Sequence, residues 1–292
     1  MESDLAEALA AFQAARPRLF GVAYRMLGSV AEAEDVLQDA WVRWQKTDRA
    51  VVEDPLAFLI TMTTRLSINE LQSARVRRET YIGPWLPEPV DTSADPTLGA
   101  ERAEALGFAV LLMLERLTPT ERAAYVLREA FAYSYEQISA VVQVSEVASR
   151  QLVSRARKHL TSESRREVPK SEQRRMLTAF LTAATTGDLS DLERLLADDV
   201  ASYSDGGGLV RASKFPVFGR ERVAKFVRAF QSRFWHGVDI AETEINGQPS
   251  VVLSKEGRVF AVVAIVLSPT GIRQLLWMMN PQKLGAVASR GA

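Results

Sequence analysis

Cysteine is absent from the 292 residues, which excludes disulfides, thiolate metal sites and cysteine nucleophiles. Histidine occurs only at His159 and His236, so a zinc site built on histidine is not expected. No apolar run approaches the about 18 residues that a membrane span needs, and the first residues lack a basic segment followed by an apolar core. We therefore expect a protein of the bacterial cytoplasm with no membrane partner.

The chain also has no excess of either charge. Lys plus Arg and Asp plus Glu both number 36. Any binding to nucleic acid must therefore come from local basic patches. The charges are segregated along the sequence, which is typical of a protein with several different partners.

Residues 133–160 carry two helix-sized patterns separated by a short turn, as in a helix-turn-helix. Apolar positions at helical spacing indicate one shared stripe, formed by Ile138, Val141, Val142, Val153, Ala156 and Leu160. Ser145 stands where a helix N-cap is expected, and Gln143 means that the turn is built without glycine. The other face of the second helix is basic and extends to Arg165 and Arg166. Such a face can contact phosphates and guanine edges, although a solvated amphipathic pair would show the same pattern.

Residues 3–80 and the segment from 101 to the helix-turn-helix are also predicted to be helical. Gly28 is expected to end the first helix, and Asp54 with Pro55 to begin another. Four prolines, at positions 84, 87, 89 and 96, exclude regular structure between 80 and 96. We interpret this segment as a linker with aromatic anchors.

After residue 166 the pattern changes to one or two helices, a first strand at 200–208, a helix at 219–234 and four further strands. These strands are rich in Val and Ile and are separated by Asn-Gly, Glu-Gly and Thr-Gly turn signals. The pattern predicts an α+β domain with a curled antiparallel sheet.

Four blocks of the helical part resemble the extracytoplasmic-function (ECF) group of bacterial sigma factors. They are RLFGVAYRMLGSVAEAEDVLQDAWVRW, DPLAFLITMTTRLSINELQSARVRR, LERLTPTERAAYVLREAFAYSYEQI and VSEVASRQLVSRARKHL. The resemblance implies two all-α modules, of which the first docks on the β′ clamp of core RNA polymerase and contacts the promoter −10 element. The second would contact the −35 element. The β flap of core RNA polymerase is a further expected partner of the chain.

Three further motifs resemble a subgroup with a fused SnoaL-like (NTF2-like) domain. They are WLPEP at 85–89, DGGG at 205–208 and NPQKL at 280–284. The resemblance implies sigma region 2 at 1–80, a linker at 81–100, sigma region 4 at 101–166 and the SnoaL-like domain at 167–292. Leu209, Gln282, Asn69 and Gln72 depart from the subgroup's usual residues.

The resemblance also assigns candidate site residues. The polymerase-binding candidates are Asp35, Gln38, Asp39 and Arg43, which would equally form an ordinary solvated helix face. The −10 candidates are Arg65, Asn69, Gln72, Ser73, Arg75, Arg77 and Arg78. The −35 candidates are Ser145, Ser149, Arg150, Ser154, Arg157 and Lys158, whereas Arg155 could pair with an acid instead. The interdomain candidates are Trp85, Leu86, Pro87, Glu88, Pro89, Asp205, Gly206, Gly207 and Gly208.

We therefore expect a sigma factor that is regulated by its own C-terminal domain and that uses no cofactor or metal. No acid-base pair stands out by spacing, so we expect no catalysis. The sequence leaves open whether the SnoaL-like pocket binds a small apolar ligand. The alternatives are a one-component ligand-responsive helix-turn-helix regulator and a SnoaL-type enzyme with a DNA-binding appendage.

Overall fold

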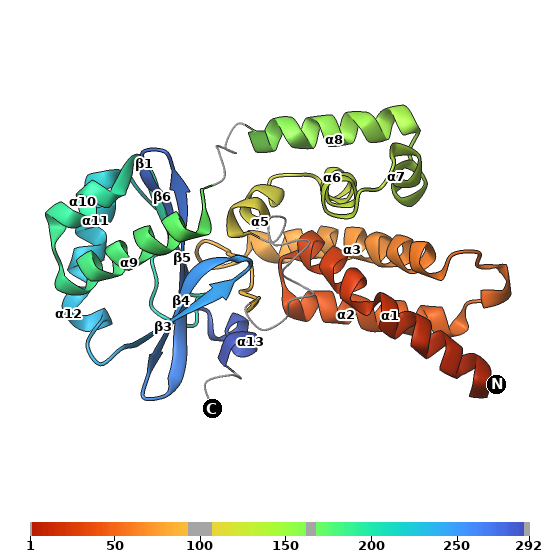
Figure 1. The fold of residues 1–292 in the computed structure, drawn as a ribbon, viewed down its shortest axis with the longest axis horizontal. Helices are drawn as coiled ribbons and strands as arrows, with labels where there is room; N and C mark the ends of the chain where they lie inside the picture. The colour runs from red at the N-terminus through yellow and green to blue at the C-terminus, as the bar shows by residue number, and fades with distance from the viewer. Residues whose placement is uncertain (1, 93–106, 162–167, 289–292) are drawn as a thin grey trace. The chain divides into compact units, whose positions relative to one another are not determined.

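The computed structural model describes residues 2–92, 107–161 and 168–288. Its residues cluster into two compact units (Figure 1). The first unit contains Met1–Glu79 and Val110–Glu163, and the second contains Thr80–Ala109 and Ser164–Ala292. Arg165 and Arg166 lie outside the described residues. In the part of the chain that the structure describes, no helix is both long and apolar enough to cross a bilayer.

The first unit begins with three helices. They are α1 (Glu2–Leu27), α2 (Val30–Lys46) and α3 (Pro55–Glu79), with a short 3-10 helix at Arg49–Val51. Gly28 has a φ of +69° and ends α1, as predicted, because glycine enters the left-handed region without a Cβ clash. Ser29 then caps α2 by accepting the Glu32 N–H.

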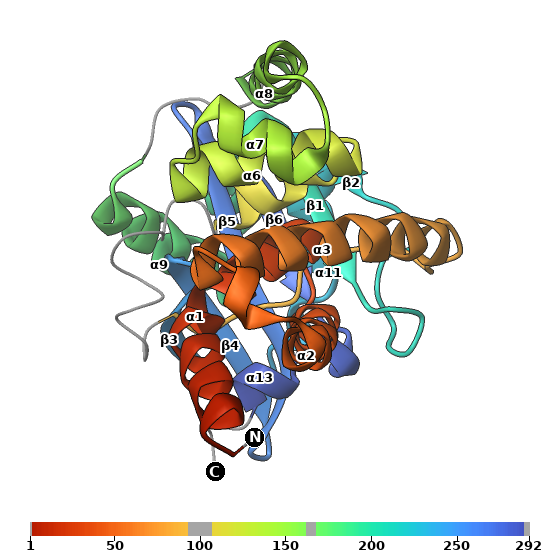
Figure 2. The ribbon, with the colours of Figure 1, turned by 90° about the vertical axis from the view of Figure 1, so that its right-hand side faces the viewer.

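The same unit continues with four shorter helices. They are α5 (Phe108–Leu114), α6 (Pro119–Phe131), α7 (Tyr135–Val142) and α8 (Glu146–Thr161). Capping boxes begin α6 and α7, with Thr118 bonded to Glu121 and Ser134 bonded to Gln137. The predicted apolar stripe is confirmed: five of its members are buried and Val142 is partly buried. Figures 1 and 2 show α6 and α7 between α8 and α3.

Gln143 forms the turn between α7 and α8. Its φ of 57° and ψ of 50° place it in the left-handed region, where it ends α7. The turn therefore uses a residue with a Cβ in a conformation that glycine would adopt freely. The left-handed conformation costs such a residue about 1 kcal/mol.

The second unit contains a six-stranded sheet. Its strands are β1 (Leu196–Asp205), β2 (Val217–Phe218), β3 (Asp239–Ile245), β4 (Gln248–Lys255), β5 (Arg258–Ser268) and β6 (Gly271–Met278). They lie in the order β2-β1-β6-β5-β4-β3. The expected antiparallel sheet is found except that β1 runs parallel to β6. No hairpin joins these two strands, so chain reversal does not impose the antiparallel direction.

The turn signals between the later strands are confirmed. Asn246 and Gly247 have φ values of 52° and 74°, and Glu256 and Gly257 have 53° and 73°. Positive φ at both central residues is typical of two-residue hairpin turns that match the strand twist. Register shifts occur in the β1–β6, β4–β5 and β5–β6 pairs. Such irregularities bend a sheet, which accounts for its curvature.

Helices cover one face of the sheet (Figure 1). They are α9 (Lys170–Thr186), α10 (Leu189–Leu195), α11 (Arg220–Ala229) and α12 (Gln231–Phe234). Phe180 and Leu192 from this layer pack in one core with Val263, Leu275 and Trp277 from the sheet. The chain then forms a 3-10 helix at Pro281–Lys283 and α13 (Gly285–Ala288).

Candidate nucleic-acid interface

The basic face of α8 is exposed. Arg150, Ser154, Arg157 and Lys158 follow helical spacing and all are solvent-accessible. The Arg150 side chain is 60% exposed, pairs with Glu146 and lies 4.8 Å from the centre of the Tyr135 ring. The Arg157 side chain is 51% exposed and lies 2.7 Å from Glu129. Exposed ion pairs are weak, so both guanidinium groups could exchange a carboxylate for a phosphate.

Ser149 corrects one prediction for this face. It is fully buried, and its hydroxyl donates to the Tyr135 and Glu146 carbonyls at 2.9 and 2.8 Å. Because it lies four residues before Val153, it falls on the apolar stripe and cannot reach a base edge. Ser145 accepts the Ala148 N–H at 3.2 Å and is the predicted N-cap.

Arg155 has the structural role that was left open. Its Nε donates to Glu121 Oε1 at 2.9 Å. Burial raises the pKa of Glu121, but the hydrogen bonds from Arg155 and Thr118 outweigh it, and the pKa is lowered overall. Glu121 also completes the capping box of α6, so Arg155 connects α8 to the start of that helix.

A polar face on α2 carries the candidate polymerase contacts. Asp35, Gln38, Asp39 and Arg43 are all exposed, and the opposite face is buried. Asp35 and Gln38 also line a groove of about 370 Å³, whose other walls include Phe12 and Trp41. Trp44 is a core residue, and its Nε1 donates to the Ala8 carbonyl at 3.0 Å.

Arg65 on α3 contacts the other helical module of the same unit. Its Nε donates to the Val141 carbonyl at 3.0 Å and its Nη2 to the Ala140 carbonyl at 2.9 Å. These carbonyls lie at the C-terminal end of α7, where a cation is favourable for the helix dipole. Asn69, Gln72 and Ser73 are exposed on α3. The side chains of Arg75 and Arg77 lie outside the described residues.

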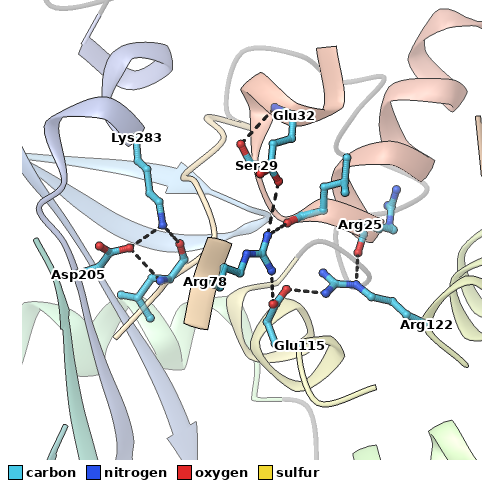
Figure 3. Close-up of polar contacts among 10 residues, drawn as sticks. Arg25, Ser29, Glu32, Arg78, Glu115, Arg122, Asp205 and Lys283 are labelled. Atoms are coloured by element: carbon cyan, nitrogen blue, oxygen red, sulfur yellow. Dashed lines mark hydrogen bonds and ion pairs between the residues drawn. The ribbon is translucent and has the colours of Figure 1, made fainter. Parts of the chain in front are cut away.

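Arg78 is held inside the unit instead of being presented to solvent (Figure 3). Its side chain is 13% exposed, donates to the Leu27 carbonyl and to Glu115, and lies 3.6 Å from Glu32. Glu115 also accepts from Arg122 Nη1 at 2.5 Å, and Arg122 Nε donates to the Arg25 carbonyl at 2.9 Å. We call Arg78, Glu115 and Arg122 the charged cluster; it connects α3 and α1 to α6.

The charged cluster shifts the titration of its carboxylate. Burial raises the pKa of Glu115, but the charges and hydrogen bonds of Arg122 and Arg78 outweigh it, so the pKa is lowered overall. The acid is therefore held ionised between two guanidinium groups. No local pattern indicated Glu115 or Arg122, since each lies far along the chain from Arg78.

In the second unit, Asp205 anchors the WLPEP segment (Figure 3). Its Oδ2 accepts the Leu86 N–H at 2.9 Å and Lys283 Nζ at 2.7 Å, and its Oδ1 accepts the Tyr81 hydroxyl. Lys283 Nζ also donates to the Leu86 carbonyl at 2.6 Å and lies 4.2 Å from the centre of the Trp85 ring. We call Asp205, Lys283 and Tyr81 the linker clamp. Sequence reasoning missed Tyr81 and Lys283, although Lys283 belongs to the NPQKL motif that it singled out.

The glycines after Asp205 allow this close approach. A Cβ on Gly207 would lie 2.3 Å from Asn280 Nδ2, and one on Gly208 would lie 2.9 Å from Ile82 Cδ1. Both glycines also have positive φ, of 60° and 73°. Asn280 donates to the Tyr81 hydroxyl at 2.9 Å, so the turn, the linker and the NPQKL segment meet at one place.

The linker also pairs with the sheet. Leu86 and Pro87 to Pro89 are buried, including Glu88, which is 7% exposed. Val90 N–H donates to Asn246 Oδ1 at 2.8 Å, and Thr92 N–H donates to the Glu244 carbonyl at 2.9 Å. The segment from 81 to 92 is therefore built into the second unit.

Comparisons with known proteins agree with the order of these parts. The family "Sigma-70 region 2" matches residues 11–77, and "Sigma-70, region 4" matches residues 107–160. ECF RNA polymerase sigma factor SigJ of Mycobacterium tuberculosis is 39% identical over 232 residues, covering 78% of this chain and 74% of that protein. The probable ECF sigma factor SigI of the same species is 31% identical and covers 94% of both chains.

A solved structure extends the similarity to the C-terminal domain. The crystal structure of M. tuberculosis SigJ superposes with a TM-score of 0.77 at 32% identity, covering 95% of this chain and 98% of that one. The likeness therefore includes the two helical modules and the helix-covered curved sheet. The chain belongs to the ECF RNA polymerase sigma factors, which act with core RNA polymerase to initiate transcription at specific promoters.

Proposed function

We propose that this sigma factor is held in a closed form in which its −10 surface is engaged by its own region 4. The observation that carries the proposal is the double hydrogen bond from Arg65 to the last carbonyls of α7. One guanidinium edge cannot serve these carbonyls and a DNA phosphate at the same time. Bidentate contact of Arg65 with a promoter phosphate through this edge would therefore require the two modules to separate.

In the open form, three surfaces would bind core polymerase and the two promoter elements. Asp35, Gln38, Asp39 and Arg43 on α2 would contact the β′ clamp, because they form one continuous exposed face. Arg65, Asn69, Gln72, Ser73, Arg75 and Arg77 on α3 would contact the −10 element, since amides can recognise bases while cations bind phosphates. The −35 element would be contacted by residues of α8 and its N-cap, namely Ser145, Arg150, Ser154, Arg157 and Lys158. The β flap would bind elsewhere on region 4.

Arg78 has a different role in this proposal. It would stabilise the closed form through the charged cluster, because its guanidinium group is bound to Glu115 and Leu27. Opening would release it together with Arg65. Any contact of Arg78 with phosphate would then belong to the open form alone.

We further propose that residues 167–292 regulate the sigma modules at 1–80 and 101–166 through the linker at 81–100. The linker clamp supports this role, because Asp205, Lys283 and Tyr81 bind the segment that connects the two modules. The Asp205 carboxylate accepts hydrogen bonds from the Leu86 N–H and from Lys283. We propose that this domain acts as a regulator without turnover, in the cytoplasm, as expected for a sigma factor.

The separation of the modules can be measured directly. Because the natural chain has no cysteine, Gln72→Cys and Gln151→Cys would supply the only thiols for spin labels, on α3 and α8 respectively. We expect a narrow distance distribution for the free protein and a longer distance with core polymerase. A pair at Ala14→Cys and Gln72→Cys, within region 2, is the matched control and should not change. An unchanged α3–α8 distance on the polymerase would contradict the closed form.

A further inference from the structure

A cavity of about 170 Å³ lies in the second unit, between the sheet and the helices that cover it. Its walls are aromatic and apolar, and they include Phe226, Phe230, Phe234, Trp235, Trp277 and Met279. The Phe234 ring stands at 90° to the Trp277 ring with centres 5.6 Å apart, and the Phe226 and Phe230 rings are 5.0 Å apart. A cavity of about 150 Å³ with apolar walls is large enough to hold benzene, so this one fits a molecule with one or two aromatic rings.

The polar groups of the cavity are few and lie in one region. Ser204, Arg211 and Ser213 line it, and Arg211 is the only charged residue among the described residues of its wall. Arg211 is exposed and makes no ion pair with any described residue, and the Ser204 hydroxyl has no hydrogen-bond partner among them either. A cation beside an aromatic pocket favours an anionic oxygen ligand, because a guanidinium group binds a carboxylate with two parallel hydrogen bonds.

We propose that this cavity binds a small aromatic carboxylate, with the ring against Phe226, Phe234 and Trp277 and the carboxylate on Arg211. The apolar walls supply most of the contact area, and the polar groups set the orientation, as in most small-molecule sites. No Asp, Glu or His is among the described residues of the wall, so nothing there is placed to move a proton to or from the ligand.

The same wall reaches the linker clamp. Ser204, Arg211, Ala212 and Ser213 also line a second hollow, of about 250 Å³, whose other wall includes Ile82 and Gly83 of the linker. A Cβ on Gly206 would lie 2.8 Å from the Ala212 Cβ, which shows how closely this wall packs on the DGGG turn. A ligand that displaces residues 211–213 would therefore press on the turn that carries Asp205.

This inference deepens the regulatory role proposed for the C-terminal domain and rests on it. Ligand binding would change the strength with which Asp205 holds the Leu86 N–H and Lys283, and thus the freedom of the linker between the two sigma modules. The signal would travel through adjoining residues of one compact unit, which is a short physical path.

Isothermal titration calorimetry of the full chain tests the ligand chemistry, with 2-naphthoate as the anionic probe and 2-naphthalenemethanol as its neutral counterpart. We expect 2-naphthoate to bind at least about tenfold more tightly, and Arg211→Gln to remove that preference, because a charge-assisted hydrogen bond is worth about a factor of ten or more. Arg211→Lys should keep part of the preference, and Arg222→Gln on the exposed side of α11 should keep all of it. Equal binding of the two probes, or no binding of 2-naphthoate, would overturn the proposal.

Hydrogen exchange of the linker tests the coupling in the same samples. Saturation of the wild-type chain with 2-naphthoate should change the exchange rate of residues 81–92, which include the Leu86 amide. The change should be smaller in the Arg211→Gln chain at the same probe concentration, because that chain binds the anion more weakly. Unchanged exchange in the saturated wild-type chain would refute the coupling. Neither measurement uses polymerase or DNA, so both test ligand binding and its coupling to the linker alone. An error in the proposed sigma function would appear instead in a transcription assay without the probe.

Discussion

At the scale of single residues, partners far apart in the sequence decide what a side chain does. Arg65 and Arg78 are both basic residues of α3, yet one binds the end of α7 and the other joins the charged cluster. Their partners lie 75 and 37 positions away, beyond the reach of any local pattern. Ser149 is different, since it was predicted to contact the −35 element although its spacing from Val153 and Ala156 places it on the buried apolar stripe.

Arg150→Ala should weaken binding to the −35 element by about 1–3 kcal/mol if Arg150 contacts a base edge. Fluorescence anisotropy on duplexes with cognate and substituted −35 sequences would measure this loss. Arg155→Ala is the control, because its guanidinium group is paired with Glu121 and should not affect sequence preference. An equal loss on every duplex would reassign Arg150 to a phosphate.

Glu115→Gln should lower the free energy of unfolding of the first unit by about 3 kcal/mol, because it leaves two partly buried guanidinium groups without their counter-charge. The folded state lowers the pKa of Glu115, so its contribution is present at neutral pH and is lost as the pH falls through the acidic range below its usual value of 4.5. Urea unfolding at pH 7 and pH 4 would measure this dependence.

The matched control for Glu115 is Glu53→Gln, at an exposed position. It should unfold like the wild type at both pH values. The difference in free energy of unfolding between the wild type and Glu115→Gln should be smaller at pH 4 than at pH 7. A larger difference at pH 4 would contradict the stabilising role of the ionised carboxylate.

At the scale of elements, local chemistry predicted more of the structure. The caps, the apolar stripe of α7 and α8, and the Asn-Gly and Glu-Gly turns all depend on neighbours within four residues, and all are found. The parallel pairing of β1 with β6 was not predicted, since four other strands and two helices separate these strands along the chain. The two-residue strand β2 is too short to produce an alternating pattern.

Gln143→Gly should stabilise the turn between α7 and α8 by about 0.5–1 kcal/mol, because glycine adopts the left-handed conformation at no steric cost. The same change at Gln151, in the exposed middle of α8, should destabilise by about 1 kcal/mol. Thermal unfolding of both variants would show opposite shifts of Tm. A lower Tm for Gln143→Gly would mean that the wild-type Gln143 side chain makes a contact worth more than the backbone strain that glycine removes.

At the scale of the whole molecule, the sequence motifs predicted the order of the parts, but not the physical form of their connections. WLPEP and DGGG were both singled out, and the structure joins them through the single carboxylate of Asp205. The proposed closed form would depend on contacts between helices that are separate in sequence, chiefly those of Arg65 and the charged cluster. In this proposal the promoter surface would have to be released before the sigma factor acts.

Run-off transcription with purified core polymerase tests this account most directly. Templates with intact, −10-substituted and −35-substituted promoters would be transcribed with the full chain, with Asp205→Ala, and with a chain ending at Arg166. We predict initiation that depends on both elements, with altered rates for the two changed chains because both lose the linker clamp, while −35 binding persists. No promoter-specific product from any of the three chains, or identical rates from all of them, would contradict the account.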